Sequence, residues 1–192
     1  FITNKSSGKQ GYEIAKSLNE NGFDTTLISG PTNLNSIKGV KLIKVESADE
    51  MLKATLNNLP TDVAIFTAAV ADFKVKKKEK EKIKKSNFSE LSLEKNTDIL
   101  GHISNHNSLR PKLVVGFAAE TSSLKNNSLK KLSEKNCDWI IANDISKSDI
   151  GFGSDFNKVS IFYKNNFEEN FPKMRKSILA KEIVNRIISQ LN

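Results

Sequence analysis

The stretch that decides the fold is Asp62-Val63-Ala64-Ile65-Phe66-Thr67-Ala68-Ala69-Val70-Ala71-Asp72. Its first half is a short apolar run that contains β-branched residues, which is typical of a buried strand. Its second half consists mainly of small residues, and small side chains at the carboxyl end of a strand let a ligand approach the backbone. Ligands of open α/β sheets bind at that edge. The stretch therefore predicts a sheet strand that leads into a ligand site.

Similar short runs follow along the chain and alternate with stretches of helical period. This alternation favours a Rossmann-like α/β fold, with a mostly parallel sheet flanked by helices. A length of 192 residues is ordinary for one domain, so we expect a single domain over residues 1–192. The expected strands are 25–29, 41–45, 63–67, 112–117, 138–142 and 158–163, and the expected helices are 10–18, 48–56, 97–105, 122–135 and 174–191, with Ser47 as a cap.

Residues 73–93 break the alternation. A run rich in lysine leads there into the alternating Leu91-Ser92-Leu93. The segment is too long and too polar for a simple loop in a compact monomer. We therefore expect a flap excursion over residues 73–93.

The net charge of +8 is compatible with nucleic acid, an anionic membrane surface or small polyanionic substrates as partners. The lysine run lacks the interleaved arginines and aromatic residues that nucleic-acid surfaces use for bidentate contacts and stacking. The apolar runs are too short to cross a bilayer, so we expect neither a nucleic-acid nor a membrane partner. A single cysteine, Cys137, and no leader before Phe1 favour a cytoplasmic location. We expect Cys137 to be inert.

The segment Asn4-Lys5-Ser6-Ser7-Gly8-Lys9-Gln10-Gly11 runs directly into a helical pattern. Hydroxyls and free backbone N–H groups at a helix start suit an anion, although an ordinary helix cap explains the same residues equally well. The segment is neither a Walker A loop nor a complete GxGxxG fingerprint. His102 and His106 lie four residues apart without the glutamate of an HExxH motif or a cysteine cluster, so we predict no metal site at these histidines and assign no metal-ligating residue.

The remaining signals are individually weak but form an ordered set. It comprises Ile2-Thr3-Asn4-Lys5-Ser6-Ser7-Gly8-Lys9-Gln10-Gly11, Leu27-Ile28-Ser29-Gly30-Pro31, Ala68-Ala69-Val70-Ala71-Asp72-Phe73, Lys82-Ile83-Lys84-Lys85, Asn96-Thr97-Asp98-Ile99-Leu100, Val115-Gly116-Phe117-Ala118-Ala119-Glu120-Thr121, Ala142-Asn143-Asp144 and Gly151-Phe152-Gly153-Ser154-Asp155-Phe156-Asn157. This set resembles the phosphopantothenoylcysteine synthetase family over nearly the whole chain, and it looks like the bacterial form that uses CTP.

The resemblance implies specific roles. Lys82 matches the family's active-site lysine and also a nucleotide contact, Asn4 matches the asparagine tied to the second half-reaction, and Ser7 and Gly8 lie near the phosphates. The residues expected to contact CTP are Phe66, Thr67, Ala68, Asp72, Thr97, Asp98, Ile99, Leu100, Phe117, Lys131 and Lys135.

The resemblance further implies the substrates 4′-phosphopantothenate, L-cysteine and CTP, with Mg²⁺ carried on the triphosphate. It implies a homodimer and a frequent fusion to a flavin-dependent phosphopantothenoylcysteine decarboxylase. Family members carry a strand and a glycine-rich turn just before the Ile-Thr-Asn segment, so we expect both to be missing from a chain that opens at Phe1.

Two alternative hypotheses for the function, each from a different functional class, stay open. A nucleotide-dependent oxidoreductase can share the fold, although the incomplete glycine fingerprint and the lack of a Tyr-x-x-x-Lys pair count against it. A basic nucleic-acid-binding module is suggested by the net charge alone.

Overall fold

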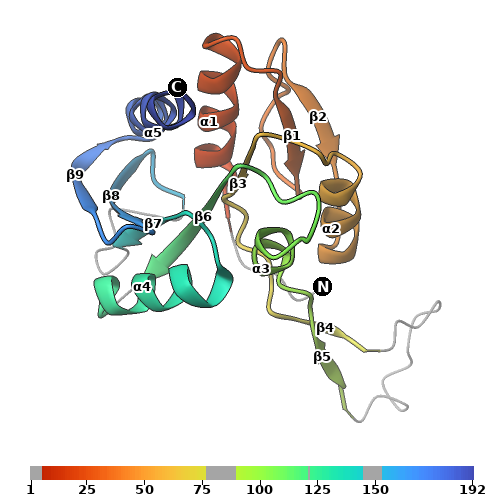
Figure 1. Ribbon diagram of the computed structural model, residues 1–192. Coiled ribbons are helices and arrows are strands. Elements are labelled where there is room, and N and C mark those ends of the chain that lie inside the picture. The colour runs from red at the N-terminus through yellow and green to blue at the C-terminus, as the bar shows by residue number, and fades with distance from the viewer. Residues whose placement is uncertain (1–5, 77–89, 121, 145–152) are drawn as a thin grey trace.

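The computed structural model describes residues 6–76, 90–120, 122–144 and 153–192 (Figure 1). Its centre is a five-stranded sheet of order β3-β6-β7-β8-β9. The strands are β3 (Val63–Phe66), β6 (Leu113–Glu120), β7 (Trp139–Asp144), β8 (Phe156–Tyr163) and β9 (Glu168–Arg175). Two further strands, β1 (Thr26–Ser29) and β2 (Lys41–Lys44), pair in parallel as a separate sheet.

The sheet combines both strand directions. The pairs β3–β6 and β6–β7 are parallel, whereas β8 runs antiparallel to both β7 and β9. The parallel strands β3, β6 and β7 therefore deliver their carboxyl ends to one edge of the sheet. This confirms the expected α/β class, with the parallel strands β3, β6 and β7 on one side of the sheet.

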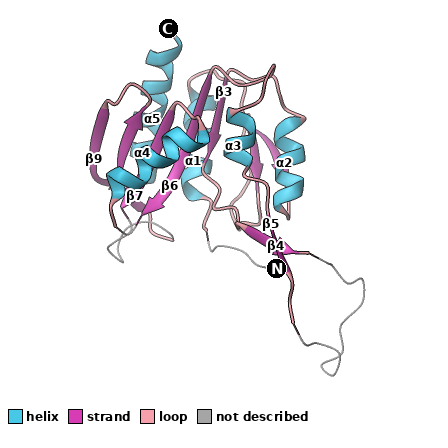
Figure 2. Cartoon of the chain, turned by 60° about the horizontal axis from the view of Figure 1, so that its bottom comes forward, coloured by secondary structure: helices cyan, strands magenta, loops and turns pink. Residues whose placement is uncertain are grey.

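Helices cover both faces of the sheet, as Figures 1 and 2 show. They are α1 (Lys9–Glu20), α2 (Ala48–Leu56), α3 (Ile99–Ser104), α4 (Leu124–Lys135) and α5 (Lys176–Leu191). At the start of α2 the Glu50 N–H donates to the Ser47 hydroxyl, and the Glu50 carboxylate accepts from the Glu46 N–H. This reciprocal arrangement confirms the expected Ser47 cap.

The core has two halves because successive residues of a strand point to opposite faces. Val115 of β6 packs in the cluster to which α1 and α5 contribute Ile14 and Ile183. Its neighbour Val114 packs on the other face with Leu132 of α4 and Phe162 of β8. All six side chains are buried, so the sheet is a layer between two sets of helices.

The sequence analysis placed the start of the last helix too early and missed the strand that precedes it. The helix expected over 174–191 begins at Lys176, and the residues before it form β9. This strand lies at the edge of the sheet, where Pro172 and a largely exposed set of polar side chains are tolerated. Only Phe171 of β9 is buried, so no apolar alternation marks the strand in the sequence.

The expected excursion has a regular base. β4 (Phe73–Val75) pairs antiparallel with β5 (Leu93–Lys95), and in Figure 2 this pair extends away from the body of the molecule. Lys74 on β4 is tied to the start of α2, since its ammonium donates to both carboxylate oxygens of Asp49 at 2.9 Å. The lysine-rich part between the two strands lies outside the described residues.

The described helices include none that is both long and apolar enough to span a membrane.

Candidate functional site

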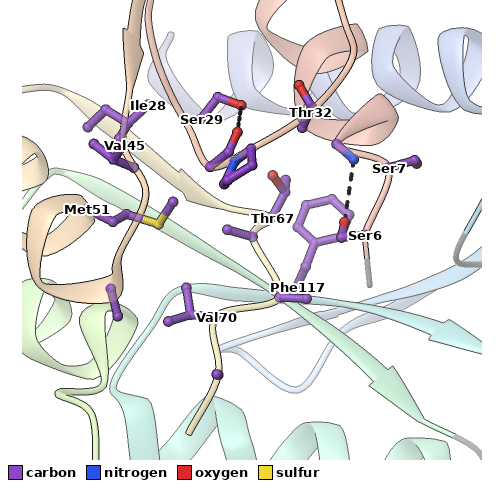
Figure 3. A pocket seen from close by; sticks show the side chains of 18 of the residues that line it. Ser6, Ser7, Ile28, Ser29, Thr32, Val45, Met51, Thr67, Val70 and Phe117 are labelled. Atoms are coloured by element: carbon purple, nitrogen blue, oxygen red, sulfur yellow. Dashed lines mark hydrogen bonds between the residues drawn. The ribbon is translucent and has the colours of Figure 1, made fainter. Parts of the chain in front are cut away.

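A cavity of about 1050 Å³ lies at the carboxyl ends of the parallel strands. It is bounded by the loop that precedes α1, by the turn after β1 and by the small residues after β3. Figure 3 shows Ser6, Ser7, Thr67, Val70 and Phe117 around it. The sheet edge predicted to carry a ligand site is therefore hollow, because small side chains leave room there.

The start of α1 is built around Gly8. Its φ of +71° lies in the left-handed region, and a Cβ at this position would come within 2.8 Å of the Thr32 side chain. The Ser6 and Ser7 hydroxyls accept from the backbone N–H groups of Gly8 and Lys9 over 3.4 Å. Bonds of that length are weak. The backbone therefore engages the two hydroxyls only weakly, and both residues line the cavity.

A second cavity, of about 980 Å³, runs along β3 and reaches α3 and α4. It brings together all the residues expected to contact CTP apart from Lys82: Phe66, Thr67, Ala68, Asp72, Thr97, Asp98, Ile99, Leu100, Phe117, Lys131 and Lys135. These positions come from the end of β3, the start of α3, β6 and α4, which are distant in sequence.

The two cavities share a wall. Thr67, Ala68 and Phe117 line both of them, and Gly11 of α1 also borders both. A Cβ on Gly11 would come within 2.6 Å of the Thr67 hydroxyl, so α1 packs directly against the end of β3. Ser7 and Gly8, which were predicted to lie near the phosphates, line the first cavity and not the second. Asn4 and Lys82 lie outside the described residues.

Two lysines that line the second cavity are held in ion pairs. The Lys131 ammonium lies 2.7 Å from the Glu120 carboxylate, and the Lys135 ammonium lies 2.6 Å from the Asp98 carboxylate. The lysines are four residues apart on α4, so they lie on one face of the helix. Each pair holds a cation at the wall of the cavity, where the phosphate or carbonyl oxygens of a ligand could replace the acid. The sequence analysis assigned no role to Glu120.

The sequence analysis assigned no role to two further polar residues that line the first cavity, Lys176 and Asn157. Lys176 is only 6% exposed, and burial lowers its pKa, which the charge of Lys9 lowers further while Asp155 opposes the change. Asn157 is 1% exposed and also lines this cavity. Asn157 occupies an inward position of β8, where a polar residue among apolar ones was the available signal. Lys176 precedes an apolar stripe and looks like an ordinary first-turn residue.

The surroundings of Cys137 agree with the expectation that it is inert. It is fully buried, away from both cavities, and burial raises the pKa of its thiol to about 11. The reactive thiolate therefore does not form near neutral pH.

Within the described ranges no group of three or more His, Cys, Asp or Glu side chains is placed to hold a metal ion. A magnesium ion carried on a nucleotide needs only one or two protein carboxylates. Asp72 and Asp98 line the second cavity, so the carboxylates present fit that mode of binding.

The model of the DNA/pantothenate metabolism flavoprotein C-terminal domain family matches residues 1–191. The coenzyme A biosynthesis bifunctional protein CoaBC of Borreliella burgdorferi is 43% identical over 188 residues, which cover 96% of this chain and 47% of that protein. CoaBC of Bacillus subtilis is 40% identical over 190 residues, covering 97% of this chain and 46% of that protein. The chain thus spans about half the length of these relatives.

The crystal structure of a CoaBC C-terminal domain superposes with a TM-score of 0.81 at 36% identity. The superposition covers 100% of this chain and 86% of that one. The fold described above is therefore the fold of that domain.

Proposed function

The chain belongs to the DNA/pantothenate metabolism flavoprotein C-terminal domain family, and from that premise we propose that it is a phosphopantothenate–cysteine ligase of coenzyme A biosynthesis. CTP activates the carboxylate of 4′-phosphopantothenate, and L-cysteine then receives the acyl group. The observation that carries the proposal is the pair of adjoining cavities, one of which collects the residues expected to contact CTP.

Activation is needed because a carboxylate does not acylate an amine at neutral pH. In the first step a carboxylate oxygen of 4′-phosphopantothenate attacks the α-phosphorus of CTP, and pyrophosphate leaves. The product is an acyl-cytidylate. In the second step the amino group of cysteine attacks the acyl carbonyl, the nitrogen loses a proton, and CMP leaves with the former carboxylate oxygen.

The shared wall supports this chemistry. The nucleotide occupies the second cavity, with Lys131 and Lys135 beside it, and the acyl substrate occupies the first. Their reacting ends then meet at Thr67, Ala68 and Phe117, which border both cavities. Holding two reactants at one junction converts a bimolecular reaction into an effectively unimolecular one.

Magnesium on the triphosphate would neutralise phosphate charge and orient the pyrophosphate leaving group. Asp72 is the exposed carboxylate best placed to hold it, since it follows β3 at the cavity wall, whereas Asp98 is paired with Lys135. Lys82 would neutralise charge in the first step, and Asn4 would position the acyl group in the second. The Ser7 and Gly8 segment supplies hydroxyls and a helix start for a phosphate.

We expect pyrophosphate to appear only when CTP and 4′-phosphopantothenate are both present, with CTP supporting the reaction far better than ATP. A coupled pyrophosphate assay with each substrate omitted in turn measures this requirement. Equal turnover with ATP would contradict the nucleotide assignment. Hydride transfer from NADPH, or salt-dependent DNA retention without turnover, would instead support the oxidoreductase or nucleic-acid reading.

A second prediction concerns the lysines of α4 that line the second cavity, and it is measured as a change in the KM for CTP. Lys135→Met should raise the KM for CTP about tenfold or more, because a charged contact is lost and the Asp98 carboxylate then repels the nucleotide. Lys130→Met is the matched control, since Lys130 is exposed on the same helix and lines neither cavity. Steady-state kinetics on both variants make the comparison. Equal KM values would show that Lys135 does not bind nucleotide.

The partners of the whole protein belong to the same proposal. The exposed Phe73, Leu91 and Leu93 at the base of the excursion offer apolar surface for a homodimer contact. The relatives carry this domain within a bifunctional protein, which supports association with a flavin-dependent decarboxylase. A cytoplasmic location fits both.

A further inference from the structure

Arg110 lies where the carboxyl ends of α3 and α4 meet, and it lines neither cavity. Its Nε donates to the backbone carbonyl of Ser104 at 2.8 Å, and its Nη2 donates to the backbone carbonyl of Asn136 at 3.1 Å. Ser104 is the last residue of α3, and Asn136 caps the carboxyl end of α4. One guanidinium group therefore joins the ends of two helices that are far apart in sequence.

The carboxyl end of a helix suits such a cation. The last carbonyls of a helix have no N–H partner within it, and they carry the negative end of the helix dipole. The charge of Arg110 is balanced by Asp138, since Nη2 lies 3.0 Å from a carboxylate oxygen of that residue. The same oxygen accepts from the backbone N–H of Val114 at 2.8 Å, so the junction is also anchored to β6.

The same two helices carry residues expected to contact CTP. Lys135 directly precedes Asn136 in α4, and Asp98 caps the start of α3. Their side chains form an ion pair of 2.6 Å at the wall of the second cavity. A Cβ at Gly101 of α3 would collide with the Asp98 carboxylate and lie within 3.7 Å of the Lys135 side chain. The packing of α3 on α4 therefore sets the position of that wall.

α3 depends on such ties because it contains only six residues, and so short a helix is marginal without tertiary contacts. The ion pair between Asp98 and Lys135 ties its start to α4, and Arg110 ties its end. A nucleotide phosphate that takes Lys135 from Asp98 breaks the first tie. Arg110 lies outside the cavity, so the second tie remains when the nucleotide is bound.

We propose that Arg110 is a positioning residue for the nucleotide, which holds α3 against α4 so that Lys135 and the start of α3 contact the same CTP molecule. The residue type follows from the task. A guanidinium presents five donors in a rigid fork, whereas the single ammonium of a lysine does not span two carbonyls and a carboxylate in this way. The inference rests on the proposed function and deepens it, since it assigns a role in nucleotide binding to a residue outside both cavities.

Arg110→Lys is the main test, because it keeps the charge and removes the fork. We expect the KM for CTP to rise about fivefold or more, since small displacements of binding groups weaken the contacts that they make. The KM for 4′-phosphopantothenate should stay within about twofold of its original value, because only uniform binding of the nucleotide is lost. Steady-state pyrophosphate release with each substrate varied in turn measures both constants.

Arg186→Lys is the matched control. The Arg186 side chain is 30% exposed, against 26% for Arg110, and it also joins two elements, because it pairs with Glu169 of β9 and Glu182 of α5. It lines neither cavity. Its replacement should lower the midpoint of thermal unfolding to a similar extent and leave the KM for CTP unchanged. Loss of stability is thereby separated from loss of nucleotide binding.

A double variant tests the route through α4. If Arg110 acts by placing Lys135, the KM for CTP of Arg110→Lys combined with Lys135→Met should rise by less than the product of the two single effects. A rise equal to that product would show two independent contributions. The proposed route from Arg110 to the nucleotide would then be wrong.

Asn105→Ala keeps the inference testable if Arg110→Lys does not fold. The Asn136 amide nitrogen donates to Asn105 Oδ1 at 3.2 Å, which is a second link between the same helix ends. Asn105 is exposed, so the variant should fold. We expect it to raise the KM for CTP about threefold, as loss of one hydrogen bond in the junction predicts.

An unchanged KM for CTP in Arg110→Lys, or in Asn105→Ala where Arg110→Lys does not fold, would overturn the positioning role and leave the proposed function intact. Equal rises in KM for both substrates, or the same rise in Arg186→Lys, would show a general loss of structure and would also overturn it. Failure of the original chain to release pyrophosphate with CTP would overturn the proposed function together with this role.

Discussion

Pyrophosphate release with CTP and 4′-phosphopantothenate is expected to stop when Lys82 is replaced by glutamine. The attack on the α-phosphate builds negative charge on a centre that is already anionic, and a cation nearby stabilises that charge. Loss of one such group slows reactions by on the order of 10²-fold or more, by comparison with oxyanion-hole deletions. Lys82 lies outside the described residues, so this expectation comes from the chemistry of the step and from the family resemblance.

Asn4→Asp provides the counterpart within the same experiment. The second step is an attack by a neutral amine, which needs a positioned dipole more than a full charge. We expect the variant still to release pyrophosphate and then to stall, with acyl-cytidylate detectable by mass spectrometry. If both variants slow the same half-reaction equally, the division of labour between Lys82 and Asn4 is wrong, although the ligase proposal would survive.

The second large effect concerns stability. Phe162→Ala should lower the free energy of unfolding by about 3–5 kcal/mol, because it removes a large side chain from a packed core. The Phe162 side chain is 1% exposed and belongs to the cluster between the sheet and α4. Urea unfolding followed by circular dichroism measures the change.

Phe167→Ala is the matched control for that change. Phe167 is 58% exposed and lies in the turn between β8 and β9. Its ring contacts the ring of Tyr163, with 5.5 Å between the two centroids. Its replacement should alter the free energy of unfolding by less than about 1 kcal/mol. A loss for Phe162→Ala as small as the loss expected for Phe167→Ala would mean that the core between the sheet and α4 contributes little to stability.

The elements that could be predicted from sequence are those whose pattern reflects burial. β3, β6 and β7 are short apolar runs because helices cover them, and α5 shows a wide apolar stripe because it packs on the sheet. β9 could not be predicted, since an edge strand with Pro172 and exposed polar side chains has no apolar alternation. The pairing of β4 with β5 joins residues about twenty positions apart, which local patterns do not encode.

The residues of the candidate site also differ in whether the sequence could predict them. The resemblance supplied residues that the fold brings together along the second cavity, including Asp98 and Lys135. It gave no role to Asn157 or Lys176, because an asparagine and a lysine that are buried look ordinary in sequence. Only the packing of α1 against α5 and β8 places them at the first cavity.

The separation of β1 and β2 from the main sheet matters for what a bound ligand touches. β1 pairs only with β2, and β3 pairs only with β6, among the strands described, while residues of both β1 and β3 line the second cavity. A ligand in that cavity therefore contacts two sheets that share no strand pairing among the residues described, and its binding should slow hydrogen exchange in β1 as well as in β3.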